Sequence, residues 1–368
     1  MKTRKCTLLI TYSCNLNCIY CYERYKSSDP KKTMSFDTAT RIIQQEIGLM
    51  QSSKKFELVE FNFFGGEPLL QFPLIRSLVE WAEAEHLTDK CYFTATSNGT
   101  LVSTEIMNWC TQHKTHFALG LSVDGIDEIQ RLNRGCDIEK IPIEFAQRTW
   151  PERPFKMTIS RQSLPTFAQN VLGLQNSGYE LISSLADGAV AWTDEDAAEY
   201  GRQLRFLAEF YLSHQQKKPM HLFLRSLPKL LDGYEKPQHK RCGVGDYTIA
   251  YDIDGTPYPC IALTPIVTRS FMNNPSIDFI SSPLDFQDPD CNKCILRNEC
   301  PTCYGQNFIH RKAFALRDHN CCKMYKTELQ VVAQMQIDYL RQANNPLNAM
   351  QQQRLQAAEQ ILKMLDMH

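Results

Sequence analysis

The stretch TYSCNLNCIYCYE, residues 11–23, carries three cysteines with the spacing C-x3-C-x2-C. It follows an apolar strand-like run at residues 6–11, so the sulfurs of Cys14, Cys18 and Cys21 can converge just beyond the end of that strand. A tetrahedral structural zinc would recruit a fourth protein ligand, whereas a [4Fe-4S] cluster on three cysteines keeps one iron open. A zinc knuckle, a disulfide with a spare thiol and three buried cysteines are the alternatives.

Composition sets the broad class. The 368 residues, 43% of them hydrophobic and 22% charged, suffice for one large α/β unit and a smaller appendage. The net charge of −1 gives no basic field, so we expect neither a nucleic acid nor a membrane as partner. The first apolar run is too short for a signal peptide or a membrane span, which predicts a cytoplasmic protein. In that reducing compartment the 15 cysteines favour metal ligation over disulfides.

Short β-branched or aromatic runs alternate with longer helical segments as far as about residue 215, which predicts consecutive βα units. The strands are expected at residues 6–11, 56–63, 91–97, 117–123, 155–159 and 181–185. Six units predict an α/β fold, a partial (β/α)6 TIM-like barrel. Ligands of such barrels bind at the carboxyl ends of the strands.

Several distinctive segments follow the predicted strands. Gly65-Gly66-Glu67-Pro68 comes after the second, Thr96-Ser97-Asn98-Gly99-Thr100 ends the third, Ser122-Val123-Asp124-Gly125 ends the fourth, and Arg161 follows the fifth. Glycines permit close approach of the backbone, and a carboxylate or carbonyl can accept hydrogen bonds from an ammonium group. Each segment by itself would be read as a turn.

Taken together, these segments resemble those of the radical S-adenosylmethionine (radical SAM) enzymes, which also have an aromatic residue where Tyr20 stands. The resemblance implies that the open iron chelates S-adenosylmethionine. It places Gly65, Gly66, Glu67 and Pro68 by the amino group, Asn98 by the nucleoside, and Ser122 and Asp124 by the carboxylate and ribose. Arg161 could pair with the carboxylate through its fork of donors. No catalytic side chain is predicted.

Cysteines return after about residue 220. Cys242 and Cys260 bracket a predicted β-hairpin with an Asp-Gly turn, and a denser group follows at Cys291, Cys294, Cys300, Cys303, Cys321 and Cys322. Metal clusters, more than a large core, would hold such a region together, with a pair of zinc sites as the alternative. We therefore predict domains at residues 1–219, 220–330 and 331–368, the last a helical segment, and the whole stretch from residue 324 to 368 is expected to be helical. Cys6, Cys91, Cys110 and Cys136 are expected to be buried.

The second region resembles the SPASM extension of radical SAM enzymes, which implies two auxiliary clusters and three [4Fe-4S] clusters in all. By that resemblance one cluster would use Cys242, Cys260 and Cys303, and the other Cys291, Cys294, Cys300 and either Cys321 or Cys322, with Cys321 as the first choice. Two departures are the two-residue gap before Cys303 and the lack of a cysteine shortly upstream of Cys242. The first cluster would then have an iron free for a substrate cysteine.

The resemblance implies cleavage of S-adenosylmethionine to a 5′-deoxyadenosyl radical that acts on a Cys-rich precursor peptide. We predict a thioether crosslink between a cysteine sulfur and a carbon of another residue, with electrons from a donor such as flavodoxin or ferredoxin. An anaerobic sulfatase maturase is the main alternative, although Ile261 stands where that subgroup has an aspartate. A carbon–carbon crosslinking enzyme and a non-catalytic iron-sulfur scaffold are the others.

Overall fold

The computed structural model describes residues 2–29, 31–188, 190–236, 240–268, 288–342 and 345–366. The chain divides into two compact units. The first unit comprises Met1–Lys156 with Gly243–Ser282, and the second comprises Met157–Cys242 with Pro283–His368. Each unit thus combines an earlier and a later part of the chain. The functional domains at residues 1–219, 220–330 and 331–368 stay a prediction, because a unit of packing need not coincide with a functional domain.

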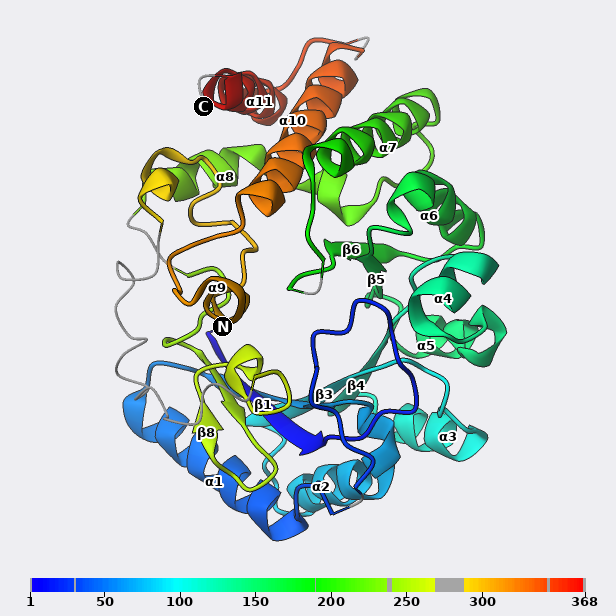
Figure 1. Cartoon of the computed structure of the whole chain (residues 1–368), viewed down its shortest axis with the longest axis vertical. Coiled ribbons are helices and arrows are strands. Elements are labelled where there is room, and N and C mark those ends of the chain that lie inside the picture. The colour runs from blue at the N-terminus through cyan, green and yellow to red at the C-terminus, as the bar shows by residue number, and fades with distance from the viewer. Residues whose placement is uncertain are drawn as a thin grey trace. The chain divides into compact units, whose positions relative to one another are not determined.

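The first unit is built on a six-stranded sheet with β1 near its middle (Figure 1). The strand order is β4 (Phe117–Leu121), β3 (Cys91–Ser97), β2 (Leu58–Gly65), β1 (Thr3–Thr11), β7 (Thr248–Tyr251) and β8 (Pro257–Tyr258). Every neighbouring pair from β4 to β7 is parallel, and β8 runs antiparallel to β7. The carboxyl ends of the first four strands therefore meet at one edge, as predicted.

Two further strands continue the alternation. β5 (Phe155–Ile159) and β6 (Leu181–Leu185) form a two-stranded sheet, and a parallel bridge joins Ser122 at the end of β4 to Lys156 in β5. The predicted α/β fold with a partial TIM-like barrel is confirmed. Strand positions are correct to within about three residues at each end.

The helices of the first unit follow the strands in turn. They are α1 (Phe36–Ser53), α2 (Phe72–Ala84), α3 (Thr104–Gln112), α4 (Asp127–Arg134) and α5 (Ile143–Thr149). Ser35 caps α1 by accepting a hydrogen bond from the backbone N–H of Thr38 at 3.1 Å. The sheet's core includes the stacked rings of Phe61 and Phe63 on Phe93. Cys6, Cys91, Cys110 and Cys136 are buried as expected.

The predicted hairpin exists, but its place in the fold was not foreseen. Ala250 pairs with Tyr258 and Tyr251 with Pro257, and the turn uses Gly255 at φ +85°. Instead of standing in an appended domain, β7 pairs in parallel with β1. Three of its residues are buried, namely Ile249, Ala250 and Tyr251. Such burial is typical of a strand inside a sheet and not of a loop held by metal ligands.

The second unit is largely helical. Its helices are α6 (Phe167–Asn176), α7 (Asp194–Ser213), α8 (Leu227–Tyr234), α9 (Tyr304–Arg311), α10 (His319–Arg341) and α11 (Ala349–Asp366). A capping box of Thr193 and Asp196 begins α7. The helical character predicted for residues 324–368 is confirmed, and the described part of the segment contains two helices, α10 and α11. Pro346 lies between them, and a proline interrupts helical hydrogen bonding.

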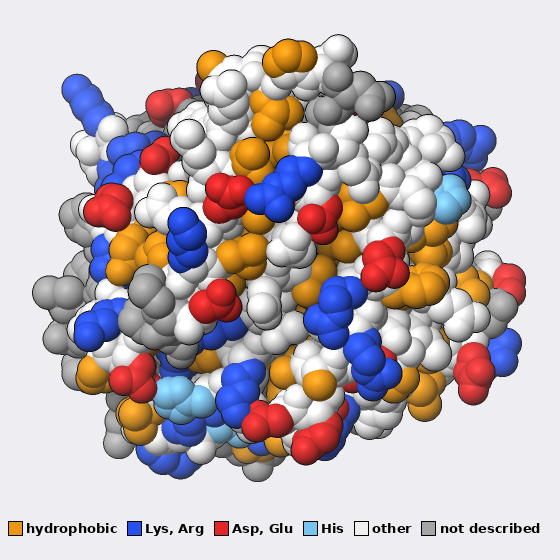
Figure 2. Space-filling model, turned by 90° about the horizontal axis from the view of Figure 1, so that it is seen from above, with side chains coloured by type: hydrophobic (Ala, Val, Ile, Leu, Met, Phe, Trp, Pro, Cys, Tyr) orange, Lys and Arg blue, Asp and Glu red, His pale blue; other side chains and the backbone are white. Residues whose placement is uncertain are grey.

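Charges of both signs are mixed on the face shown in Figure 2, in agreement with the net charge of −1. Among the helices that the structure describes, none is long and apolar enough to cross a membrane.

Candidate functional site

The first cysteine group lies in a loop, residues 12–27, that leaves the carboxyl end of β1 (Figure 1). We call it the cysteine loop. Cys14, Cys18 and Cys21 are partly buried, and the backbone N–H of Cys21 donates to the carbonyl of Cys18 at 3.1 Å. Burial raises the pKa of Cys14, and it raises that of Cys18 to about 11 although Arg134 opposes it. Deprotonation therefore requires positive charge, which a bound metal supplies.

The two glycines after β2 permit close contact with the cysteine loop. A Cβ on Gly65 would lie 2.2 Å from the carbonyl oxygen of Thr11, and one on Gly66 would lie 2.2 Å from that of Ser13. The backbone N–H of Glu67 donates to the same Ser13 carbonyl at 2.8 Å. Any side chain at residues 65–66 would therefore force the loop away from β2.

Glu67 joins the ends of two strands. Its buried carboxylate accepts hydrogen bonds from the hydroxyl of Ser97 at 2.8 Å, the backbone N–H of Asn98 at 2.9 Å and that of Leu69 at 3.0 Å. Burial raises the pKa of Glu67 in spite of these donors. A carboxylate has about four acceptor positions, so this side chain keeps little capacity for a further donor. Pro68 begins the short helix that follows it.

Asn98 holds the loop from the end of β3. Its amide nitrogen donates to the side-chain oxygen of Asn15 at 2.9 Å, and the amide of Asn15 donates to the hydroxyl of Thr100 at 2.8 Å. Asn15 follows Cys14 directly, so these bonds fix the backbone next to the first cysteine of the loop.

Asp124 holds the loop from the end of β4. Its carboxylate accepts from the hydroxyl of Tyr20 at 2.5 Å and from Asn133 at 3.2 Å, and it lies 3.0 Å from the guanidinium of Arg134. Asp124 and Arg134 are both buried. Arg134 was not predicted as a site residue from the sequence, although it stands ten residues after Asp124 at the end of the next helix. The ten-residue separation of Asp124 and Arg134 could indicate their pairing only if the helix α4 had first been predicted between them.

A second group missed from the sequence is Glu23, two residues after the last cysteine. Its side chain is buried, with Oε2 4.0 Å from the sulfur of Cys21, and its Oε1 has no hydrogen-bond partner among the described residues. Burial raises the pKa of Glu23 to about 8. Lys26 interacts with Cys21, Cys14 and Glu23. The Oε1 atom of Glu23 is therefore available to a hydrogen-bond donor close to the cysteines.

The remaining predicted contacts are less central. Ser122 is buried in the first unit, where its backbone N–H donates to Ser97 at 3.1 Å. Arg161 lies in the second unit and forms an ion pair with Asp196 at 3.0 Å. Its role toward a cofactor stays a prediction.

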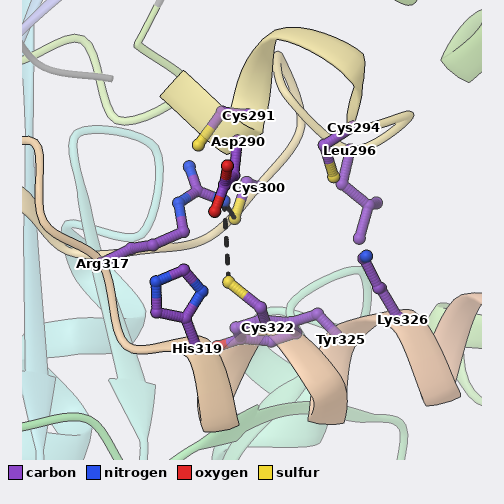
Figure 3. A pocket seen from close by; sticks show the side chains of 10 residues that line it. All are labelled: Asp290, Cys291, Cys294, Leu296, Cys300, Arg317, His319, Cys322, Tyr325 and Lys326. Carbon is purple, nitrogen blue, oxygen red and sulfur yellow. Dashed lines mark hydrogen bonds between the residues drawn. The ribbon is translucent and has the colours of Figure 1, made fainter. Parts of the chain in front are cut away.

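Four cysteines of the second unit surround a cavity of about 70 Å³, shown in Figure 3. They are Cys291, Cys294, Cys300 and Cys322. One water needs about 10–15 Å³ on this measure, so a group larger than a single ion fits. Burial raises the pKa of Cys291 to about 12 and also raises the pKa of Cys300 and of Cys322. Cys322 lines this cavity, whereas Cys321, our first choice from the sequence, is not among its lining residues.

The other predicted ligand set is divided between the units. Cys242 and Cys303 belong to the second unit and Cys260 to the first. Their common site stays a prediction, as does the ligand role of Cys321. Across the described ranges, no three Cys, His, Asp or Glu side chains are gathered as closely as a single metal ion needs. An iron-sulfur cluster separates its cysteine ligands with several metal atoms, so it needs a wider spacing.

Comparison with known proteins agrees with this geometry. Residues 8–141 match the family described as the radical SAM superfamily. A cysteine-type anaerobic sulfatase-maturating enzyme of Clostridium perfringens (strain 13 / Type A) is 33% identical over 129 residues, which are 33% of this chain and 32% of that protein. The chain spans between 30% and 43% of the lengths of the curated relatives compared.

Two solved structures share the fold over most of the chain. The structure of anSMEcpe with bound AdoMet has a TM-score of 0.67 at 17% identity and covers 99% of each chain. SuiB of Streptococcus suis, bound to its precursor peptide SuiA, has a TM-score of 0.60 at 17% identity, covering 87% of this chain and 76% of SuiB.

A partial barrel with three cysteines at the end of its first strand is typical of enzymes that use an iron-sulfur cluster. Residues 8–141 of this chain therefore form a domain that matches the radical SAM superfamily. Domains of this family bind a [4Fe-4S] cluster and S-adenosylmethionine.

Proposed function

We propose that this protein is a peptide maturase that forms a thioether between a cysteine sulfur and a carbon of another residue. The supporting observation is the cysteine loop, held at the ends of β2, β3 and β4 by Glu67, Asn98 and Asp124. With the cluster and S-adenosylmethionine bound, the chemistry supplied is reductive cleavage to a 5′-deoxyadenosyl radical that removes hydrogen from carbon.

Different residues of the first unit would bind the cluster and S-adenosylmethionine. Cys14, Cys18 and Cys21 would hold the cluster. Glu23 would accept the ammonium of S-adenosylmethionine, because its Oε1 lacks a partner among the described residues. Asp124, already neutralised by Arg134, keeps the loop in register and leaves no unpaired buried charge.

A peptide substrate is favoured by the fold shared with SuiB, which was solved with a precursor peptide. The balance of the reaction is simple. One substrate hydrogen leaves with the deoxyadenosyl group, the thiol proton goes to solvent, and a carbon–sulfur bond forms. One electron is released in forming this bond and would be accepted by the clusters when they are bound, and an external donor such as flavodoxin or ferredoxin would supply the electron for each cleavage.

We also propose three [4Fe-4S] clusters, with Cys291, Cys294, Cys300 and Cys322 holding one of the two auxiliary ones. Cys322 replaces Cys321 in this set because it lines the cavity. The other auxiliary cluster would use Cys242, Cys260 and Cys303.

The test is anaerobic incubation with S-adenosylmethionine, a reductant and candidate Cys-rich peptides, followed by mass spectrometry. A product lighter by two hydrogens and resistant to thiol alkylation supports the proposal. Replacing the substrate cysteine by serine should abolish it.

Formylglycine formation is the second candidate, favoured by the identity to the sulfatase-maturating enzyme. Conversion of the cysteine to an aldehyde in the same assay would establish it instead. Ile261 follows Cys260 at the start of a short helix and provides no carboxylate there, which counts against this candidate.

A further inference from the structure

Arg317 lies in the cysteine-lined cavity of the second unit and is almost fully buried, with 7% of its surface exposed. Its Nη1 donates hydrogen bonds to two sulfurs, that of Cys322 at 3.7 Å and that of Cys300 at 3.8 Å (Figure 3). Its Nε has no partner among the described residues. Burying a guanidinium among thiols is costly unless negative charge accompanies it.

Negative charge is what a cluster at this site would bring. Four thiolates on a cluster core of charge about +2 leave a net charge of about −2, and reduction adds one more electron. A fixed buried cation therefore stabilises the reduced form more than the oxidised form. Hydrogen bonds to the ligand sulfurs act in the same direction, because they withdraw electron density from the iron.

The other polar groups of the cavity differ from Arg317. Lys326 and Asp290 line it, and within the described ranges neither side chain donates a hydrogen bond to a sulfur. His319 is largely exposed, with 63% of its side chain accessible, and lies 3.7 Å from Asp288. Arg317 therefore combines burial, charge and direct contact with two of the four sulfurs.

We propose that Arg317 is a positioning residue that raises the reduction potential of the cluster held by Cys291, Cys294, Cys300 and Cys322. This inference rests on the proposed function, because it needs a cluster at that site. It predicts that this cluster accepts an electron more readily than it would beside a neutral side chain.

The experiment is a redox titration of the full chain under anaerobic conditions, followed by electron paramagnetic resonance. The signal of this cluster is the one that disappears in Cys294→Ala. Arg317→Gln should lower its reduced-to-oxidised ratio at fixed potential at least tenfold, which is about 59 mV for one electron. Lys326→Met is the matched control, removing a charge from the same cavity, and should change the ratio less.

Arg317→Lys covers the case in which the glutamine variant does not fold. The lysine keeps the positive charge but lacks the forked N–H donors of the guanidinium. A smaller lowering of the reduction potential than in Arg317→Gln therefore supports the proposal. An unchanged potential at full iron content in a folded Arg317 variant overturns it, as does an equal shift in Lys326→Met. Loss of the cluster from both folded Arg317 variants also overturns it, because the residue would then be needed for assembly. If Cys294→Ala removes no signal and no iron, the proposed ligand set fails and this inference fails with it.

Discussion

The hydroxyl of Tyr20 lies 2.5 Å from the carboxylate of Asp124, although the two residues are 104 positions apart. Tyr20 stands between two cysteines of the loop, and Asp124 follows β4. The guanidinium of Arg134 lies 5.6 Å from the Tyr20 ring centre and also pairs with Asp124. The loop that carries the cysteines is thus attached to the barrel by the hydrogen bond from Tyr20 to one member of a buried ion pair.

Asp124→Asn should destabilise the first unit by about 3–5 kcal/mol, because Arg134 is left buried without its counter-charge. Tyr20→Phe removes one hydrogen bond to a charged group and should cost about 1.5–3 kcal/mol. Urea unfolding under anaerobic conditions measures both. Tyr339→Phe, at an exposed position, is the control. Equal stability of Asp124→Asn and the unaltered protein would contradict the proposed anchor.

Replacing Cys14, Cys18 and Cys21 together by alanine should abolish formation of 5′-deoxyadenosine while iron remains bound to the later cysteines. The reason is that the proposed ligand sets are separate. Chromatography of the nucleoside and iron analysis of the same sample decide the matter. Cleavage that continues at the original rate would exclude these residues as ligands of the catalytic cluster.

Cys322→Ser should lower the iron content by up to about four atoms per chain from a full complement of about twelve. Cys321→Ser is the neighbouring control and should leave the iron content unchanged, since Cys321 does not line the cavity. Iron and sulfide analysis after reconstitution makes the comparison. The reverse result would restore Cys321 as the ligand.

Glu46→Gln should cost about 3–5 kcal/mol of unfolding free energy. Glu46 is fully buried, pairs with Arg4 and accepts from the hydroxyl of Tyr251 at 2.5 Å. Glu180→Gln removes an exposed partner of Lys218 and should cost less than about 1 kcal/mol. A similar loss in the two variants would show that the buried pair contributes no more than a surface one.

Stability in acid should depend on Glu83. Burial alone would raise the pKa of Glu83, but hydrogen bonds from His113 at 3.0 Å and His116 at 2.8 Å outweigh it and lower the pKa. The charged form therefore stabilises the folded state above the unfolded pKa of about 4.3, and this contribution is lost as pH falls through the lower folded value.

Thermal melts of Glu83→Gln should accordingly fall below those of the unaltered protein at pH about 5.5 and converge with them near pH 3. Glu85→Gln, at an exposed position in the same segment, is the control. A difference that persists unchanged at the lowest pH would show that the loss is one of packing.

The parts of the fold and site that repeat along the chain were predictable from the sequence. Strand alternation located β1 to β6, and the cysteine spacing located the first site, because both depend on neighbouring residues. The pairing of β7 with β1 was not predictable, since it joins residues about 240 positions apart and a strand of four residues carries little pattern. Arg134 and Arg317 were missed for a related reason. A single arginine has no periodicity, and only the folded chain shows that its charge is buried.

The place of β7 also matters for how the protein is made. A ribosome synthesises β1 about 240 residues before the strand that pairs with its second edge, which is a delay of about 12–48 s at ordinary rates of synthesis. Until then β1 presents unpaired backbone donors and acceptors, which is a hazard for aggregation. Metal that binds the nascent chain before β7 is made would bind next to an incomplete sheet. A fragment that ends before Thr248 lacks β7, so it would keep this sheet incomplete.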